Sequence, residues 1–340
     1  MNTLANRFCI CNAFVKQSAQ SSQILGFERM KKSAFGIVIG VVLALTAGLS
    51  VSCVKEVTLP NIFFRRQPVV VGLLSPDSLI SLRLTYSLAP SDTGKYQSIT
   101  NANVRFFENG LPIGELNNAQ SGLYALNRKP TVGKQYAIKV RVEGYPEITA
   151  VDSVPVRPSL LLSKFASTSN PNQNPDLELS VRNIKSIHLG SVWFGVYAKQ
   201  EYELFVPNVT YYGFSQLNVL SNSTYLDRFN AFFDNLSGKY IFGDPVRIAT
   251  DLIASNPNLT VKFTHLNKAQ TKYKDTYFMY AFTASAAYNK YLKSATNSQQ
   301  NILYSNGELN NPFAEPTPIY SNITNGLGIW AGCSGVKIPF

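Results

Sequence analysis

Two histidines, His188 and His265, are the residues best suited to act as a general base or to bind a metal, and the sequence contains no others. His265 continues the alternation of Leu259, Val261 and Phe263, so we expect it in the core or at the edge of a strand. No acidic residue stands four positions from either histidine, and the His-Glu-x-x-His pattern is absent. A Ser-His-Asp triad assembles in space and is not excluded by spacing, but no Gly-x-Ser-x-Gly motif marks a nucleophile. The sequence therefore predicts no catalytic residues, no metal site and no cofactor.

Two pairs of acidic residues lie two positions apart, Asp176 with Glu178 and Glu201 with Glu203. Residues i and i+2 share one face of a strand, which is typical of a solvated surface. A glycosidase needs two carboxylates facing each other across a cleft, and the sequence singles out no such pair. A hydrolase acting on glycans or peptides stays an alternative hypothesis.

Aromatic residues cluster in two short stretches, TYYGF at 210–214 and NAFFD at 230–234. Exposed aromatic side chains can stack on sugar rings or form the centre of a partner interface. We favour the other interpretation, in which these rings fill the core of a sheet or pack between domains.

The stretch YSNITNGLGIWAG, residues 320–332, contains three glycines and raises the question of a phosphate-binding loop. Such a loop is followed by the N-terminus of a helix, whereas Ile329 and Trp330 begin a β-type run. Asn325-Gly326 is a strong turn signal. The pattern predicts a closing hairpin that completes the sheet of the C-terminal domain.

The N-terminal region carries a signal-peptide pattern that begins at Met30. Two lysines precede an apolar run at 34–49, and small residues then lead to Cys53. This order predicts a lipoprotein signal, with acyl chains such as palmitate attached to Cys53 and Met30 as the initiator. A spanning helix or an ordinary secretory signal is the alternative, but the apolar run is shorter than the roughly 20 residues that a spanning helix needs.

Removal of residues 1–52 changes the charge and cysteine content of the chain. Lys plus Arg falls from 31 to 26 and Asp plus Glu from 20 to 19, so the net charge drops from +11 to +7. These charges are dispersed, whereas nucleic-acid binding needs a clustered basic stripe, so we expect no nucleic-acid partner. Cys9 and Cys11 are removed and Cys53 is acylated, which leaves Cys333 without a disulfide partner. We expect Cys333 to be a small buried hydrophobic residue.

Alternating apolar and polar residues dominate the rest of the chain and predict a mainly β protein. Asn109-Gly110 predicts a type I′ hairpin, and prolines between 154 and 158 end the first module. In the second part, 275–283 has the pattern of a central strand, and Ser285 caps one short helix. Between 206 and 259 we expect long loops or irregular strands. The predicted order is an upstream extension at 1–29, a signal peptide at 30–52, a lipid-anchored tether at 53–66, an immunoglobulin-like β-sandwich at 67–156, and a β-rich domain with one short helix at 159–340.

Several segments in order resemble a family of Bacteroidota lipoproteins known as domain of unknown function 4249. The resemblance covers the mature chain and is most specific near the C-terminus. The segments are SCVKEVTLP (52–60), PVVVGLLSP (68–76), NANVRFFENG (101–110), GLYAL (122–126), SAAYNKYLKS (285–294) and NPFAEPTPIYSNITNGLGIWAG (311–332).

The resemblance implies a cell-envelope lipoprotein whose N-terminal β module is carboxypeptidase-regulatory-like or immunoglobulin-like. Such lipoproteins often accompany an outer-membrane TonB-dependent transporter. The family has no established activity, so the resemblance supplies no catalytic residues. Acidic residues after the cysteine are associated with surface export in this phylum, and here only Lys55-Glu56 follows Val54, so the periplasmic and surface faces both stay open. We therefore predict a non-enzymatic protein held in the outer membrane through Cys53, with a transporter as partner. A structural or adhesive surface module is a further alternative, and the sequence does not name a ligand.

Overall fold

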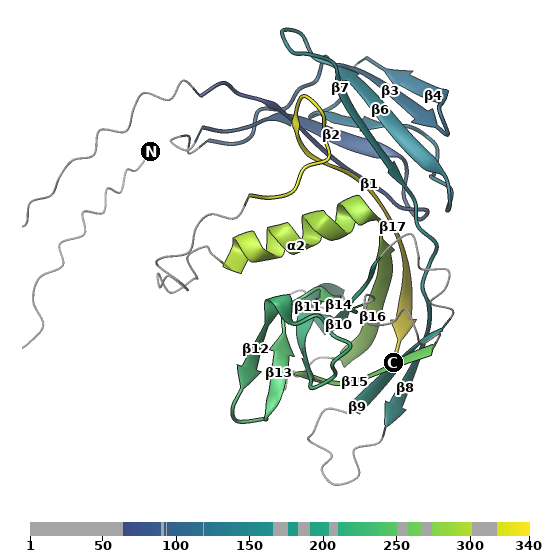
Figure 1. Ribbon diagram of the computed structural model, residues 1–340, viewed down its shortest axis with the longest axis vertical. Coiled ribbons are helices and arrows are strands. Elements are labelled where there is room, and N and C mark those ends of the chain that lie inside the picture. The colour runs from purple at the N-terminus through teal and green to yellow at the C-terminus, as the bar shows by residue number, and fades with distance from the viewer. Residues whose placement is uncertain are drawn as a thin grey trace, which may run out of the picture. The chain divides into compact units, whose positions relative to one another are not determined.

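The computed structural model describes residues 64–89, 92, 94–117, 119–165, 176–182, 191–203, 210–249, 258–266, 274–300 and 318–340. The predicted signal peptide, Cys53 and His188 lie outside these residues. The described chain is mainly β, with two sheets and one α-helix, as the sequence predicts (Figure 1).

The N-terminal part of the described chain is a β-sandwich. Its first sheet contains β5, β2 and β1 in that order, and its second sheet has the order β4-β3-β6-β7. Apolar residues at every second position point between the two sheets, because successive side chains of a strand alternate in direction. The strands are β1 (Pro68–Leu74), β2 (Ser81–Tyr86), β3 (Asn103–Glu108), β4 (Leu111–Leu116), β5 (Leu123–Ala125), β6 (Gln135–Arg141) and β7 (Ile148–Ser153).

The turn between β3 and β4 confirms the predicted hairpin. Asn109 and Gly110 have φ angles of 49° and 83°, and a type I′ turn requires positive φ at both central residues. This local signal sets the pairing next to the turn, Glu108 with Leu111 and Phe107 with Pro112, and the register shifts between Phe106 and Phe107.

The last strand, β17 (Leu327–Pro339), belongs to both halves of the described chain. Residues 327–332 pair with β1 in parallel, and residues 333–339 pair with β16 (Lys274–Ala284) in antiparallel. Strand β17, the long yellow strand in Figure 1, thus joins the first sheet of the sandwich to the sheet of the C-terminal part.

The predicted closing hairpin at Asn325-Gly326 is therefore wrong. Asn325 does adopt a positive φ of 61°, but the residues before it form only an isolated bridge, Thr324 to Thr149. The strand after the turn pairs with a strand of the sandwich that lies more than 250 residues earlier in the chain. Turn chemistry identifies a bend, whereas the partner of the strand depends on contacts distant in sequence.

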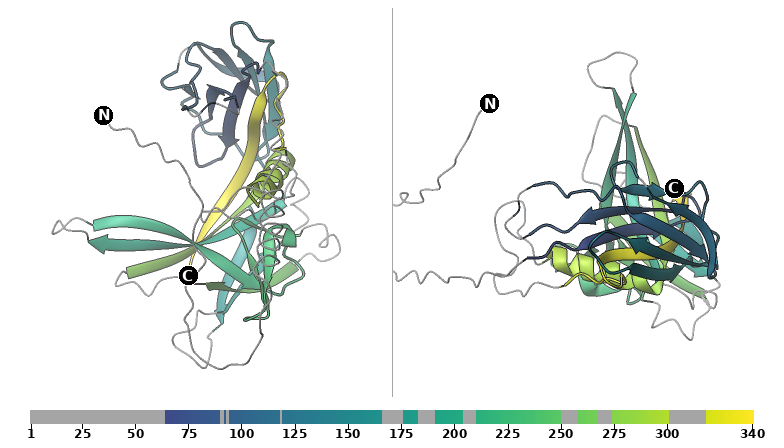
Figure 2. Two further views of the ribbon diagram at one scale, coloured as in Figure 1. Left: turned by 90° about the vertical axis from the view of Figure 1, so that its left-hand side faces the viewer. Right: turned by 90° about the horizontal axis from the view of Figure 1, so that it is seen from above.

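The sheet of the C-terminal part is antiparallel, with the order β17-β16-β10-β11-β15-β9-β8. Its long strands are strongly twisted, as Figure 2 shows. The predicted central strand at 275–283 is confirmed, because β16 pairs on both sides. The other bounds are β8 (Ser159–Phe165), β9 (Asp176–Arg182), β10 (Ser191–Glu203), β11 (Thr210–Ser221), β12 (Ala231–Asp234), β13 (Lys239–Phe242), β14 (Val246–Arg247) and β15 (Asn258–Leu266).

The region that we expected to be loops or irregular strands contains regular structure. Strand β11 has 12 residues, and β12 and β13 form a hairpin that pairs with its end. Its many Asn, Ser and Tyr residues weaken the apolar alternation, but pairing on both sides of the strand overrides that weak local preference.

Helix α2 (Ala286–Gln300) packs on the outer side of this sheet, where Tyr288 and Leu292 contact Trp193 and Phe282. Ser285 caps it as predicted, since its Oγ accepts a hydrogen bond from the backbone N–H of Tyr288 at 3.1 Å. The helix runs through the polar tract to Gln300, so it is longer than the apolar pattern alone indicates.

Candidate functional site

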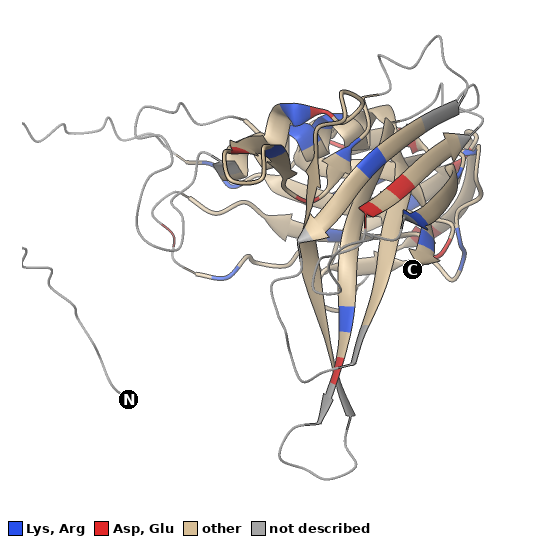
Figure 3. Cartoon of the chain, turned by 90° about the horizontal axis from the view of Figure 1, so that it is seen from below, with Lys and Arg blue, Asp and Glu red and all other residues tan. Residues whose placement is uncertain are grey.

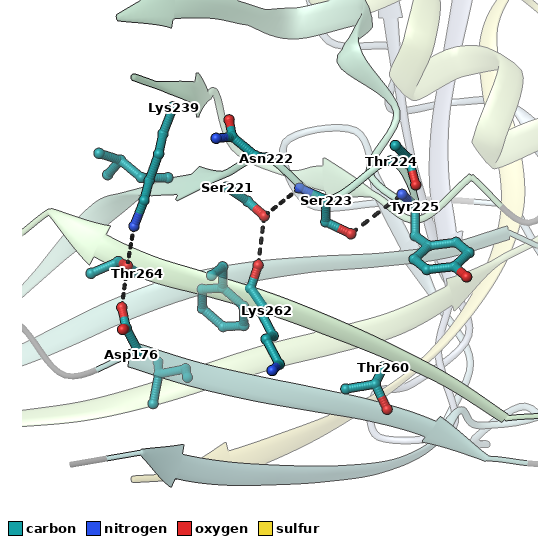
Figure 4. Close-up of a pocket in the computed structure, with 13 residues that line it drawn as sticks. Asp176, Ser221, Asn222, Ser223, Thr224, Tyr225, Lys239, Thr260, Lys262 and Thr264 are labelled. Carbon is teal, nitrogen blue, oxygen red and sulfur yellow. Dashed lines mark hydrogen bonds between the residues drawn. The ribbon is translucent and has the colours of Figure 1, made fainter. Parts of the chain in front are cut away.

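A pocket of about 620 Å³ opens where the end of β11 meets β9, β13 and β15 (Figure 4). Three buried apolar residues, Leu177, Leu220 and Phe263, also line it, and Leu177 and Phe263 belong to the hydrophobic core. Polar side chains form the rest of the wall. They are Asp176, Ser221, Asn222, Ser223, Thr224, Tyr225, Lys239, Thr260, Lys262 and Thr264.

One side of the pocket is a hydrogen-bonded row of three side chains. The Lys239 ammonium donates to Thr264 Oγ1 at 3.3 Å, and the Thr264 hydroxyl donates to Asp176 Oδ1 at 2.6 Å. Each residue comes from a different strand, β13, β15 and β9 respectively. The row therefore exists only because those strands come together in the sheet.

The opposite side is a serine-rich turn that follows β11. Ser221 Oγ donates to the carbonyl of Lys262 at 2.5 Å and accepts from the backbone N–H of Ser223 at 3.0 Å. Ser223 Oγ accepts from the N–H of Tyr225 at 3.3 Å. Side-chain-to-backbone bonds of this kind fix the turn and leave its other polar groups facing the pocket.

The pocket has little net charge, with Lys239 and Lys262 facing one carboxylate among the described lining residues, Asp176. Lys262 also lies 3.9 Å from Glu178, an exposed ion pair that contributes little stability. Figure 3 shows basic and acidic residues scattered over the described chain, without a continuous basic stripe in that view. The site is built to donate and accept many hydrogen bonds, with modest positive charge.

His265 does not line the pocket and packs against two aromatic rings that are tilted relative to it. It is 2% exposed, and its ring centroid lies 5.3 Å from that of Tyr277 and 5.9 Å from that of Phe340. Burial, together with the charge of Lys164, lowers the pKa of His265 to about 4, so the ring is neutral at neutral pH. The predicted core position of His265 is confirmed.

The two acidic pairs of the sequence, Asp176 with Glu178 and Glu201 with Glu203, lie in different surroundings in the structure. Asp176 lines the pocket, whereas Glu178 pairs with Lys262 beside it. Glu201 lies on β10 and pairs with Lys199 at 3.0 Å. The sequence grouped Asp176 with Glu178 as a solvated face, and it did not indicate that Asp176 shares a pocket with the Ser221–Tyr225 turn.

We expected the aromatic residues at 210–214 and 230–234 to fill the core of a sheet or to pack between domains, and this prediction is wrong for four of them. Tyr212 and Phe214 on β11 are 56% and 66% exposed, and Phe232 and Phe233 on β12 are 62% and 51% exposed. On β11 the strand alternation sends Leu217 and Val219 into the core and leaves Tyr212 and Phe214 on the other face. On β12 both adjacent rings are exposed, in a strand that pairs with β13 alone among the described strands.

Cys333 is buried, as expected, and burial raises the pKa of its thiol to about 11. Such a thiol is protonated and unreactive at neutral pH. Within the described ranges, no group of three or more His, Cys, Asp and Glu side chains could hold a metal ion. Among the same residues, no helix is long and apolar enough to cross a membrane.

Sequence reasoning missed the pocket as a whole. A signal was present in SNSTY at 221–225, since a cluster of Ser, Asn and Thr after a strand indicates a turn with many polar groups. That signal does not show which strands surround the turn. Lys239 and Thr264 lie 18 and 43 residues after Ser221, and no local pattern connects the three residues.

These features define a protein class: a mainly β protein, with a sandwich joined through one shared strand to a twisted sheet that carries a polar pocket. Residues 56–338 match the family of domain of unknown function 4249, and the chain belongs to that family. No curated protein matches the chain. The matched range includes the sandwich, the pocket and β17, so the family assignment covers the whole described architecture.

Proposed function

We propose that this chain is a non-enzymatic binding protein of the bacterial cell envelope, anchored in the outer membrane through acyl chains on Cys53. In this proposal it works with a TonB-dependent transporter and holds a polar ligand in the pocket beside the Ser221–Tyr225 turn. The observation that carries the binding role is the pocket itself, with its wall of hydroxyl, amide and ammonium groups. Its volume lies within the range usual for small-ligand sites.

The polar wall favours a ligand with many hydrogen-bonding groups, such as an oligosaccharide or a peptide. Serine and threonine hydroxyls both donate and accept hydrogen bonds, and the amide of Asn222 can do the same. Leu220, which lies opposite Thr264 on the same face of the sheet, offers an apolar contact for the carbon face of such a ligand.

The exposed aromatic residues support a partner protein. Tyr212 and Phe214 lie on β11, and Phe232 and Phe233 lie on β12, which β13 separates from β11. Aromatic residues are enriched at the energetic centres of protein interfaces. They provide a contact surface that is separate from the pocket-lining residues.

Lys239→Ala is expected to weaken ligand binding by about tenfold or more, because it removes an ammonium group and one hydrogen-bond donor from the pocket wall. The measurement is binding of the purified protein to an array of oligosaccharides and peptides, followed by titration of the best member. Lys337→Ala, at an exposed lysine of β17 that does not line the pocket, is the matched control and should bind normally. Equal binding by both variants, or no binding by the unmodified protein, would count against a ligand in this pocket.

Cys53→Ala is expected to move the protein from the membrane fraction to the soluble fraction, because it removes the thiol that carries the acyl chains. Fractionation of cells followed by immunoblotting checks this. Sedimentation of the variant with membranes would show that Cys53 is not the anchor.

Affinity purification from solubilised outer membrane tests the partner. Enrichment of a transporter supports the accessory role, and absence of a transporter favours a structural or adhesive module.

One observation favours a hydrolase as the second candidate. The Thr264 hydroxyl lies between the Lys239 ammonium and the Asp176 carboxylate, so a hydroxyl, a cation and a base are in contact. Product release from an oligosaccharide or peptide by the unmodified protein, lost in Asp176→Asn, would favour this candidate over a binding role.

A further inference from the structure

We propose that the outer edge of β8 binds an extended segment of a partner protein, which pairs with β8 as an additional strand. This site goes beyond the proposed function, because β8 contributes no lining residue to the pocket and the pairing requires neither the anchor nor a transporter. Strand β8 is the last strand of the C-terminal sheet and pairs with β9 alone among the described strands (Figure 1). One of its two edges is therefore available.

The backbone groups at this edge determine what kind of molecule can bind there. In an antiparallel pair, alternate residues bond to the neighbouring strand, and the N–H and C=O groups of the other residues point away from it. No backbone hydrogen bond from the described residues reaches the side of β8 that faces away from β9. A second extended backbone presents donors and acceptors at the matching spacing, so the edge selects a strand.

The other three strands that end the two sheets are each protected against such pairing. Strand β5 has only three residues. Strand β4 contains Pro112, and its pairing with β3 has a register shift. Strand β7 is covered at Thr149 by a bridge to Thr324. Short strands, prolines, bulges and covering loops are common devices that prevent strand addition. Strand β8 has seven residues, no proline and no register shift.

The hydrophobic core is also less well covered at β8 than at the next strand. Leu179 and Val181 on β9 are fully buried in the core. Leu162 and Leu160 lie directly opposite them on β8, yet they are only partly buried. Leu161, on the other face of β8, is exposed. An added strand with apolar side chains on the core face would remove Leu160 and Leu162 from water.

Lys164 indicates the charge of the partner segment. Its ammonium group lies 5.6 Å from the centroid of the Phe340 ring and forms no ion pair with a described residue. The sequence of β8, SLLLSKF, contains no acidic residue. A second copy of the chain that paired through its own β8 would bring no carboxylate to Lys164. A partner segment with an acidic residue at that position is complementary in charge.

The probe is a peptide library designed on the register of β8. Neighbouring strands from β17 to β8 are antiparallel, so an antiparallel peptide continues the sheet. In the parent peptide, Ser-Asp-Thr-Val-Thr-Val-Thr-Ser, the Asp then lies opposite Lys164 and the two Val lie opposite Leu162 and Leu160. The library varies the Thr positions among Thr, Ser and Asn, and the Val positions among Val, Ile and Leu. Fluorescence anisotropy measures binding to the full mature protein in detergent. We expect saturable binding, and the absence of binding by every member overturns the proposal.

Lys164→Glu is expected to weaken binding of the best peptide by about fivefold or more, because attraction becomes repulsion. Replacing the Asp of the peptide by Lys should restore binding to this variant, which a purely structural role of Lys164 does not predict. Lys129→Glu changes an exposed lysine of the sandwich and is the matched control, with normal binding expected. Equal binding by the two variants, or no restoration by the exchanged peptide, overturns the proposal.

Two measurements locate the peptide. Hydrogen exchange should slow at the amides of β8 on peptide binding and stay unchanged in β4. Protection of β8 without peptide would mean that another segment of the chain or a second copy already pairs there, and it overturns the proposal. Two further peptides are N-methylated at the odd or at the even residues. Only one set of N–H groups faces β8, so one peptide should bind and the other should not. Equal binding by both shows that no strand pairing occurs and also overturns the proposal.

Lys239→Ala separates this site from the first pocket. The variant should bind the peptide normally, because Lys239 lines the pocket and does not lie on β8. Peptide binding that is lost in Lys239→Ala and kept in Lys164→Glu would place the peptide in the pocket, which overturns the proposal and supports the pocket as a binding site. Failure of the pocket to bind a ligand leaves the expected results for β8 unchanged.

Discussion

Trp330→Ala is expected to lower the free energy of unfolding by about 3–5 kcal/mol, with the N-terminal sandwich losing its structure first. Trp330 is fully buried, and its ring lies 6.2 Å from that of Phe106 between centroids. Its indole N–H donates to the carbonyl of Tyr136 at 3.0 Å. Alanine would leave a large cavity and an unsatisfied carbonyl in a sandwich whose other strands all lie before residue 154.

Because the chain has two tryptophans, one in each part, the unfolding of the sandwich and of the C-terminal part can be followed separately. Trp193 lies against α2 in the C-terminal part, and Trp330 lies in the sandwich core. Urea unfolding followed by circular dichroism gives the loss of stability, and Trp193 fluorescence reports on the C-terminal part in the same variant. Phe214→Ala is the control, since that ring is mostly exposed, and it should change stability by less than about 0.5 kcal/mol. A loss below 1 kcal/mol for Trp330→Ala would contradict the shared role of β17.

Gly328→Ala is expected to be at least as damaging, at about 4 kcal/mol or more, because two effects combine. Gly328 has a φ of 109°, a conformation that side chains rarely adopt. A Cβ atom there would lie 2.0 Å from the carbonyl oxygen of Val70, which is backbone of the paired strand and cannot move aside. The β1–β17 pairing would have to separate at this point.

Gly133→Ala separates the two effects. Gly133 also has a positive φ, of 79°, but a Cβ atom there would meet no atom within 4 Å. This variant should therefore cost only about 1 kcal/mol, the penalty of the left-handed conformation. Thermal or urea unfolding measures the loss of stability in the Gly328→Ala and Gly133→Ala variants. Equal costs would mean that the contact with Val70 contributes nothing.

The sandwich strands were predictable because their information is local. The alternation around Leu82 and Leu84, and again around Ile138 and Val140, places one face in the core whatever the partner strand is. The Asn109-Gly110 turn and the Ser285 cap are similarly determined by a few adjacent residues. The family resemblance also came from sequence, and the match over 56–338 confirms it.

The candidate sites were not predictable to the same extent. Asp176 was recognised only as one of a solvated pair, and no local pattern linked it to Thr264 and Lys239, with which it forms a hydrogen-bonded row. Burial and missing partners are properties of the folded surroundings, so a residue's type cannot reveal them.

The β class, the turns, the helix cap and the family follow from the sequence, because each depends on periodicity or on residues close together in the chain. The folded chain is needed to show that residues 327–332 complete the sandwich and that Lys239, Thr264 and Asp176 share one pocket. Strand pairing can join segments at any separation, and its free energy comes from packing and hydrogen bonds that form only when the whole sheet assembles. The same stretch around Trp330 therefore predicts a strand correctly and its partner wrongly.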